Sequence, residues 1–356
     1  MKKKIYPSML LLLLPLFIFM QACDKKNNPD PEPETPVNPE DPKPPVTPKP
    51  AKFYYVGYKY PSSFKETTKH AILRINDSLV NLSSTLISDA VDVYPLNNDV
   101  HITGYQQDKA GNRKVAYWKN NKVTLYGTAA NISTGTAIFA TGNKVYVAGM
   151  QQEPTGVGNY RWVNGVKERA GCCLSHTRIN SMAEGNGSVV SAGQFALTAA
   201  MWVGGNIISL ADATSNSFFI KTINKDIYVL GYRNQKSGTD VAAVWKNDQE
   251  IFVLPHGQNI LSLAATMVGQ DYYFVINSYD GSRGNATVYK NKTLLYKLSP
   301  TKNLEAKAIQ VHEGKVYVLG NYYNGTKSSA VLWTNGQPKV LYDESKKIHL
   351  NDMVIK

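Results

Sequence analysis

From residue 53 onward, apolar and polar residues alternate in short runs, which is the period of a β-strand. The same kind of run returns about every 43 residues and usually ends in a glycine, called here the landmark glycine. The seven copies are FYYVGY (53–58), HITGY (101–105), VYVAGM (145–150), VVSAGQ (189–194), IYVLGY (227–232), YFVINS (273–278), where Asn277 replaces the glycine, and VYVLGN (316–321). No stretch after residue 52 has a helical period over ten or more residues, so we expect an all-β fold.

A second motif, with the pattern apolar-apolar-Trp-x-Asn-Gly, follows each run after ten to twenty residues. Its copies are LRIND (73–77), YWKNN (117–121), RWVNG (161–165), MWVGG (201–205), VWKND (244–248), VYKNK (288–292) and LWTNG (332–336). All five tryptophans fall in one column of this motif, with Arg74 and Tyr289 in the other two copies, at spacings of 44, 44, 40, 43, 44 and 44. We interpret the column as core that fills the space between neighbouring repeats, and Arg74 as the mark of an irregular or partly solvated place.

Each repeat predicts four short antiparallel strands. In one copy these are TAIFA (136–140), VYVAG (145–149), NYRWV (159–163) and VKERA (166–170). Asn164-Gly165 between the last two is a strong hairpin signal, because a type I′ turn needs two positive φ angles. Four strands every 40–45 residues resemble the blade of a β-propeller, as in WD-repeat and kelch proteins. There is no Trp-Asp dipeptide, kelch double glycine or sialidase box, so the resemblance implies a fold and no functional family.

The phase of the repeats predicts how the ring closes. Residues 53–58 read as the second strand of a blade, and DMVIK (352–356) reads as an innermost strand. The C-terminal strand should therefore join the N-terminal blade and close seven blades into a ring, which removes exposed sheet edges.

Residues 1–22 resemble a bacterial lipoprotein signal peptide. Three lysines precede an apolar run from Met9 to Met20 that is too short to span a bilayer, and Ala22-Cys23 follows. The resemblance implies cleavage before Cys23 and lipidation of its thiol.

Residues 23–52 then form a tether, since ten of the 18 prolines lie between residues 24 and 50. Proline-rich spacers of this kind resemble those of lipoproteins in Bacteroidota-type bacteria. We therefore expect an exported outer-membrane lipoprotein, on the cell surface or the periplasmic face, with its propeller at 53–356 and contact with the membrane only through the lipid.

Charge and cysteine content exclude several classes of function. Removing residues 1–22 takes away three lysines and no acid, so the net charge falls from +12 to +9. The positive charges are spread along the chain without a basic cluster, so nucleic acid is not an expected partner. No CxxC pair, metal-ligand histidine spacing, Walker loop, dinucleotide motif or nucleophile elbow occurs, so no metal or cofactor is expected.

Candidate ligand-binding residues gather in the loops between strands two and three and between strands four and one, which meet on one face of a propeller. Aromatic residues follow the landmark glycines, and basic residues follow them; rings offer stacking surfaces and arginine binds carboxylate or sulfate. The candidates are Tyr58, Tyr105, Tyr232, Tyr322, Arg233, Arg283, His176 and Arg178, with Tyr279, Lys59, Arg113 and Lys327 beside them. The alternative is that these tyrosines shield blade edges and the cations only solvate the loops.

Cys172 and Cys173 are adjacent, so they could form a vicinal disulfide or remain free thiols. We also expect His176, His256, His349, Glu305, Asp343 and Glu344 near the channel mouth. The leading interpretation is a non-catalytic binding or scaffold domain that recognises a glycan or a protein partner on its loop face. The alternative is a carbohydrate-active enzyme, a polysaccharide lyase or glycoside hydrolase acting on acidic polysaccharide.

Overall fold

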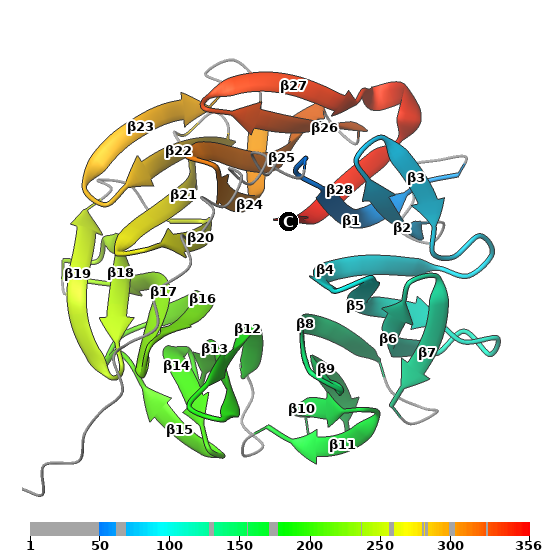
Figure 1. Ribbon diagram of the computed structural model, residues 1–356, viewed down its shortest axis with the longest axis horizontal. Helices are drawn as coiled ribbons and strands as arrows, with labels where there is room; N and C mark the ends of the chain where they lie inside the picture. The colour runs from blue at the N-terminus through cyan, green and yellow to red at the C-terminus, as the bar shows by residue number, and fades with distance from the viewer. Residues whose placement is uncertain are drawn as a thin grey trace, which may run out of the picture. The chain divides into compact units, whose positions relative to one another are not determined.

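The computed structural model describes residues 50–61, 69–127, 132–154, 156–170, 177–235, 237–255, 260–279, 281, 284–298, 303–324 and 327–356. These residues form seven four-stranded antiparallel sheets arranged as blades around a central axis (Figure 1). The fold is a seven-bladed β-propeller. This confirms the fold class predicted from the repeats.

Each blade is named here by its innermost strand. From innermost to outermost, the sheets are β28 (Ile348–Ile355), β1 (Phe53–Lys59), β2 (His70–Ile75) and β3 (Ser78–Asn81); β4 (Ser88–Leu96), β5 (Asp99–Gln107), β6 (Arg113–Lys119) and β7 (Lys122–Tyr126); β8 (Ser133–Thr141), β9 (Lys144–Glu153), β10 (Gly156–Val163) and β11 (Val166–Arg169); β12 (Arg178–Gly185), β13 (Ser188–Phe195), β14 (Thr198–Val203) and β15 (Asn206–Ser209); β16 (Ser215–Ile223), β17 (Asp226–Asn234), β18 (Asp240–Lys246) and β19 (Gln249–Pro255); β20 (Ser262–Val268), β21 (Asp271–Tyr279), β22 (Gly284–Lys290) and β23 (Thr293–Leu298); and β24 (Asn303–His312), β25 (Lys315–Asn324), β26 (Lys327–Thr334) and β27 (Gln337–Tyr342). Within the described ranges, the single short 3-10 turn η2 (Glu344–Lys346) is the only helix, and no helix is long or apolar enough to cross a membrane.

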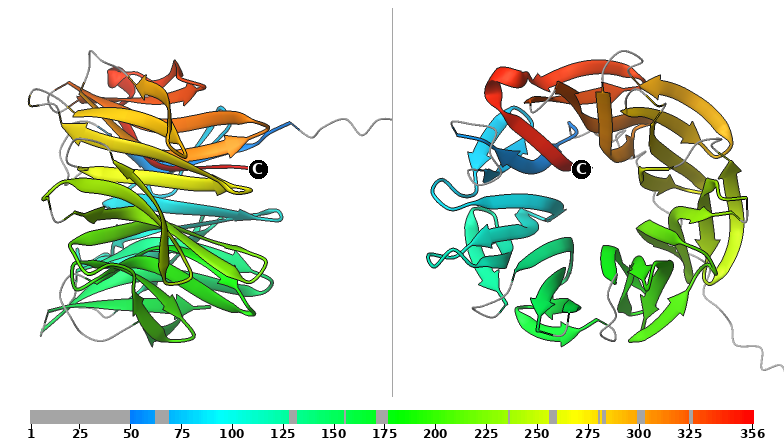
Figure 2. Two further views of the ribbon diagram at one scale, coloured as in Figure 1. Left: turned by 90° about the vertical axis from the view of Figure 1, so that its left-hand side faces the viewer. Right: turned by 180° about the vertical axis from the view of Figure 1, so that it is seen from behind.

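The two ends of the propeller meet in one sheet, as the repeat phase predicts. β28 pairs antiparallel with β1, and Lys52 and Lys356 exchange backbone hydrogen bonds of 2.8 and 3.0 Å. Leu350 and Met353 of β28 are fully buried in a core cluster with Tyr55 and Ile72. The C-terminal strand lies beside β1 in both face-on views of the ring (Figures 1 and 2).

The tryptophan column is core, as the sequence predicts. Trp118, Trp162, Trp202, Trp245 and Trp333 are all buried. The place of Arg74 in this column is irregular but not solvated, which corrects part of the expectation. Arg74 is 7% exposed, its guanidinium lies over the rings of Tyr55 and Tyr342, and it donates a 2.7 Å hydrogen bond to Asp77.

The asparagine of the Trp motif explains why the hairpins between strands three and four recur. Asn164 and Gly165 both have positive φ, at 48° and 86°, which confirms the predicted turn. The Asn164 carboxamide also accepts a 2.8 Å hydrogen bond from the Val145 backbone N–H at the start of the second strand. In five other blades the equivalent asparagine accepts the same hydrogen bond from a backbone N–H of the second strand; these are Asn76, Asn120, Asn247, Asn291 and Asn335.

Candidate functional site

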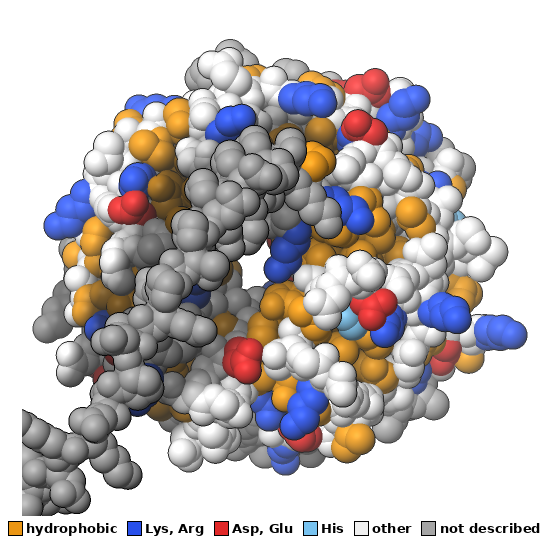
Figure 3. Space-filling view, viewed as in Figure 1, with side chains coloured by type: hydrophobic (Ala, Val, Ile, Leu, Met, Phe, Trp, Pro, Cys, Tyr) orange, Lys and Arg blue, Asp and Glu red, His pale blue; other side chains and the backbone are white. Residues whose placement is uncertain are grey.

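A cavity of about 520 Å³ occupies the central channel, and residues from the innermost strands of all seven blades line it. Figure 3 shows the hollow at the centre of the ring. Its volume is within the range of about 300–1,000 Å³ that is typical of small-molecule sites. The channel is therefore the candidate functional site.

β-Bulges determine which side chains point into this channel. In six blades the innermost strand carries one extra residue opposite the landmark glycine of the second strand, and that residue lines the cavity. The extra residues are Val91, Thr136, Asn180, Phe218, Lys307 and Asn351. In the five blades where the two strands follow each other in sequence, the extra residue lies 13 positions before the glycine, as Val91 does before Gly104.

The close approach of the innermost strand at the bulge explains why the second strand has a glycine there. A Cβ at Gly104 would overlap the carbonyl oxygen of Asp89 in the innermost strand. The β20 blade has Asn277 at this position, and its strands β20 and β21 pair without a register shift. The Asn277 carboxamide instead exchanges two 2.8 Å hydrogen bonds with the backbone of Ala306 in the next blade.

The innermost strands β24, β28 and β4, with the residues packed on them, form what we call the closure half of the channel. Here Lys69 and Asp89 make a buried ion pair of 3.1 Å, and Asn351 Nδ2 donates to Asp89 Oδ1 at 2.7 Å. The Lys69 ammonium also lies 4.5 Å from the centroid of the Tyr58 ring and 5.4 Å from that of Tyr105. The charges on this side of the channel thus satisfy one another.

His349 lies in the middle of the closure half. It is 6% exposed and stacks on Tyr58 with the ring centroids 4.9 Å apart. Burial, together with the nearby ammonium groups of Lys307 and Lys69, lowers the pKa of His349 to about 3, so its imidazole is neutral. On its other side, Glu305 accepts hydrogen bonds from Lys307 and from the Tyr323 hydroxyl, the latter at 2.9 Å.

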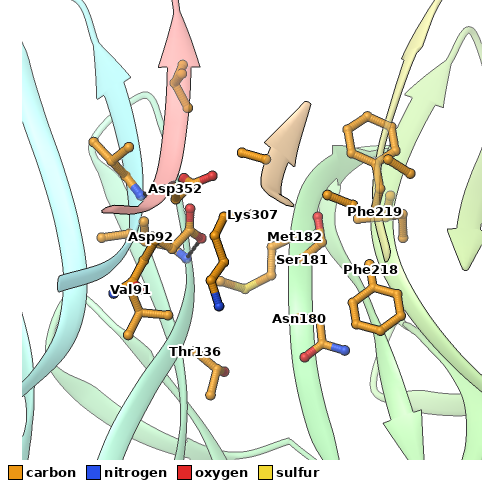
Figure 4. Close-up of a pocket in the computed structure, with 18 of the residues that line it drawn as sticks. Val91, Asp92, Thr136, Asn180, Ser181, Met182, Phe218, Phe219, Lys307 and Asp352 are labelled. Atoms are coloured by element: carbon orange, nitrogen blue, oxygen red, sulfur yellow. Dashed lines mark hydrogen bonds between the residues drawn. The ribbon is translucent and has the colours of Figure 1, made fainter. Parts of the chain in front are cut away.

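Two carboxyl groups, Asp92 and Asp352, lie side by side on the wall of the closure half (Figure 4). They are hydrogen-bonded to each other, which requires one of them to carry a proton. Burial and the neighbouring carboxylate raise the pKa of Asp92 well above its usual range, and burial raises that of Asp352. Asp92 also accepts a 2.8 Å hydrogen bond from the Ile138 N–H, so the pair joins neighbouring blades.

The strands β12, β16 and β20 form the open half of the channel, where two hydrogen-bond donors have no acceptor among the described residues. Arg178, at the start of β12, lines the cavity and is exposed to it. Its guanidinium has no hydrogen-bond or ion-pair partner among the described residues. Burial among the surrounding side chains lowers the pKa of Arg178 below its usual range, although the channel admits water to it.

Asn216 occupies the same position in β16 that Arg178 occupies in β12, two residues before the bulge. Asn180 Nδ2 donates to Asn216 Oδ1 at 2.9 Å and to the Ser217 carbonyl at 2.8 Å. The amide nitrogen of Asn216 donates to no residue in the described part of the chain. Phe218, the next bulge residue, stacks on Tyr232 with centroids 5.9 Å apart, and it lies with Phe219 on the opposite side of the cavity from Asp92 and Asp352 (Figure 4).

The tyrosines predicted from the loops separate between these surroundings and do not form one plate. Tyr58 lies in the closure half, and Tyr105 is buried between Lys69 and Arg113. Tyr232 supports Phe218 of the open half, whereas Tyr322 packs edge-on against Trp333, with centroids 5.5 Å apart. Their rings therefore contribute mainly to packing within and between blades.

Of the predicted cations, Arg178 lines the channel, whereas Arg233 is paired with Glu250 of its own blade. Cys23, Cys172, Cys173, His176, His256 and Arg283 lie outside the described residues. His349 and Glu305 were expected in loops, but they lie within β28 and β24. Those strands begin earlier than the sequence pattern indicates. Asp343 caps η2 and is exposed beside Glu344 on the connection to β28.

Sequence reasoning missed Asp92, Asp352, Asn216 and Phe218. The offset of 13 residues before each landmark glycine identifies Phe218 as a channel residue and places Asp92 next to one. Asn216 lies two residues before Phe218 in the same strand, so the count from Gly231 locates it as well. No group of three or more potential metal ligands occurs among the residues that the structure describes.

No family model matches this chain, and no curated protein matches it in sequence. Among solved structures, it is similar to a puromycin-hydrolyzing peptidase of Mycobacterium tuberculosis, with a TM-score of 0.55 and 11% identity over 82% of this chain and 52% of that chain. It is also similar to the β-propeller domain of the Trilobed protease of Pyrococcus furiosus (TM-score 0.52, 10% identity, 83% of this chain and 93% of that chain). A third similar structure is the acylaminoacyl peptidase of Pyrococcus horikoshii (TM-score 0.51, 13% identity, 83% and 51%).

The chain spans about half the length of the two complete peptidases, and it matches the isolated propeller domain over nearly its whole length. At these identities the likeness shows the propeller fold alone.

Proposed function

We propose that this chain is an exported lipoprotein of the cell envelope whose propeller binds a ligand in its central channel without catalysis. Lipidation at Cys23 and the proline-rich segment 24–50 would hold the propeller away from an outer membrane. The observation that carries the binding role is the open half, where the Arg178 guanidinium and the Asn216 amide nitrogen line a cavity of about 520 Å³ and donate to no other described residue. Donors that converge on a concave cavity without a protein acceptor are available to the polar groups of a ligand, which favours a binding site.

The closure half supports binding over acid–base chemistry. The two carboxyl groups of a glycoside hydrolase are about 5 Å or more apart to accommodate the sugar or a water, whereas Asp92 and Asp352 are hydrogen-bonded to each other. His349 is enclosed by rings, and the Tyr323 hydroxyl is engaged with Glu305. These groups are committed to holding blades together.

A glycan fits the lining better than a protein partner. Neutral amide and hydroxyl groups of Asn180, Asn216, Gln310 and Ser181 line the channel beside the Phe218 ring. Such groups match the hydroxyls of a sugar, and an aromatic ring offers an apolar surface to its face.

A glycan array probed with the full chain, followed by affinity measurements on the glycans it retains, tests the binding role. Val91→Trp places a large ring at a channel bulge, and Val166→Trp places the same ring on an outer strand where Val166 is 67% exposed. We expect Val91→Trp to abolish binding and Val166→Trp to leave it unchanged. Equal binding by both variants would reject the channel as the site, and release of shortened saccharides would favour the enzyme.

Metabolic labelling with an alkyne-bearing fatty acid tests the anchor in a bacterial host. The full chain should become labelled and fractionate with the outer membrane, whereas Cys23→Ala should lose the label. Labelling of Cys23→Ala equal to that of the unchanged chain would reject the lipidation site.

A further inference from the structure

The open half holds a positive charge that the protein does not neutralise. Other arginines of the propeller, such as Arg74, Arg161 and Arg233, each pair with a carboxylate. Arg178 lines the cavity with no such partner among the described residues. Arg178 is exposed to the channel, so its guanidinium is free to form a charge-assisted hydrogen bond with an anion supplied by a ligand.

Asn216 supplies a second donor whose orientation is already set. Its Oδ1 accepts the hydrogen bond from Asn180 at 2.9 Å, so its Nδ2 is the end of the amide that remains to donate. Asn180 is in turn fixed by its 2.8 Å bond to the Ser217 carbonyl. Arg178 and Asn216 occupy equivalent positions in neighbouring innermost strands, so their side chains begin at the same level of the channel.

We infer that the channel ligand is an acidic saccharide, and that Arg178 with Asn216 binds its carboxylate or sulfate while the Phe218 ring lies beside the sugar. This rests on the proposed function and names its ligand class. The planar guanidinium matches the two oxygens of a carboxylate or sulfate, which an ammonium does not. The neutral amides and hydroxyls of the lining are suited to sugar hydroxyls rather than to a charged peptide backbone terminus alone.

Calorimetry on the full chain tests this inference with four probes: tetragalacturonate, its methyl ester, a sulfated tetrasaccharide and a short peptide with a free carboxyl terminus. We expect an acidic saccharide to bind about 10- to 100-fold more tightly than the uncharged ester, because bonds to charged groups contribute most. The carboxylate and sulfate arms identify which anion is preferred. Tighter binding of the peptide than of either acidic saccharide would overturn the saccharide assignment.

Variants then locate the anion. Arg178→Gln should remove the preference for the acidic probe, and Arg178→Lys should restore only part of it. Asn216→Asp keeps the oxygen that accepts from Asn180 but offers Arg178 an internal carboxylate. Asn216→Asp should therefore lower the affinity for the acidic saccharide more than 10-fold, and the same variant should have a higher melting temperature without ligand. Arg233→Gln, in the β16 blade but paired with Glu250 outside the lining, should leave affinity unchanged.

The outcomes separate this inference from the proposed function. A neutral saccharide whose binding is lost in Val91→Trp but is unchanged in Arg178→Gln would overturn the anion site and keep the channel. Failure of every acidic saccharide to bind would also overturn the inference. Acidic binding that survives Val91→Trp would reject the channel itself.

Discussion

The two halves of the channel differ in how they treat the same positions of the repeat. Two residues before the bulge, the closure half has Asp89, Glu305 and His349, and each is packed or paired with neighbours from adjoining strands. The open half has Arg178 and Asn216 at the equivalent positions, and their donors point to no described partner. A repeated backbone therefore supports two different roles, depending on whether its side chains satisfy one another.

The closure half is also where the two ends of the propeller meet. The closure half contains the junction between β28 and β1, the one sheet made from both ends of the propeller. Polar links across that junction, such as Asn351 to Asp89 and to the Ala90 carbonyl at 2.8 Å, tie the junction to the next blade. The open half has a link of the same kind, because Asn180 donates to Asn216 Oδ1 and to the Ser217 carbonyl of the next blade. What it lacks, among the described residues, is a carboxylate to pair with Arg178, so that cation is available to a ligand.

Removing residues 348–356 should have the largest effect. It deletes β28, exposes the edge of β1 and removes the buried Leu350 and Met353 from their core cluster. We expect the soluble, cooperatively folded protein to be lost, or its melting temperature to fall by more than about 15 °C. Circular dichroism during heating measures this, and an unchanged melting temperature would contradict the closure.

Lys69→Met should have the next largest effect on stability. It leaves the buried carboxylate of Asp89 without its ammonium partner, so the free energy of unfolding should fall by about 3 kcal/mol. Lys246→Met, which removes an ammonium from the exposed pair with Asp226, serves as the control and should lower the free energy of unfolding far less than Lys69→Met. Equal losses in urea unfolding would show that the closure half is not held by its buried charges.

Asp92→Asn should change the pH dependence of stability. The native pair holds a proton above the usual pKa of an aspartic acid, so its contribution is fully present below about pH 4 and is lost as the pH rises through the raised pKa. An asparagine donates to Asp352 without a titratable proton, so the variant should be more stable than the unchanged chain at pH 8 and the difference should shrink as the pH falls toward 4.

His349 makes stability depend on pH in the opposite direction, and it does so in both the unchanged chain and Asp92→Asn. Its lowered pKa means that stability falls as the pH drops below about 6.5, the ordinary pKa of histidine, toward 3. The comparison of Asp92→Asn with the unchanged chain between pH 4 and 8 thus isolates the carboxyl pair. Parallel stability curves over that range would contradict a shared proton.

The sequence predicted the ring because the repeat is local. Alternating strands, Asn164-Gly165 and the tryptophan column each lie within about 45 residues, and together they predicted seven blades and their closure. The channel was predicted less well, because a bulge changes the alternation on which facing directions depend. Asp92 and Asp352 are 260 positions apart in the chain, and only the closed ring brings them together.

Arg178 was among the predicted ligand-binding residues, but its lack of a partner could not be predicted. Arg233 looks alike in sequence and is neutralised by Glu250, whose strand is two away from its own. Whether a guanidinium is paired depends on which side chains of other strands reach it, and the sequence pattern does not give that side-chain geometry. The landmark glycine, by contrast, locates the channel residue 13 positions before it once the bulge in the innermost strand is known.

The free energy of unfolding of Arg178→Met, measured by urea denaturation at low ionic strength without ligand, tests most directly whether the open half carries an unsatisfied charge. The account predicts that the variant is as stable as the unchanged chain or more stable by up to about 1 kcal/mol, since methionine removes a charge that has no partner. A loss of about 3 kcal/mol, like that expected for Lys69→Met, would mean that Arg178 is already paired and would contradict the open half.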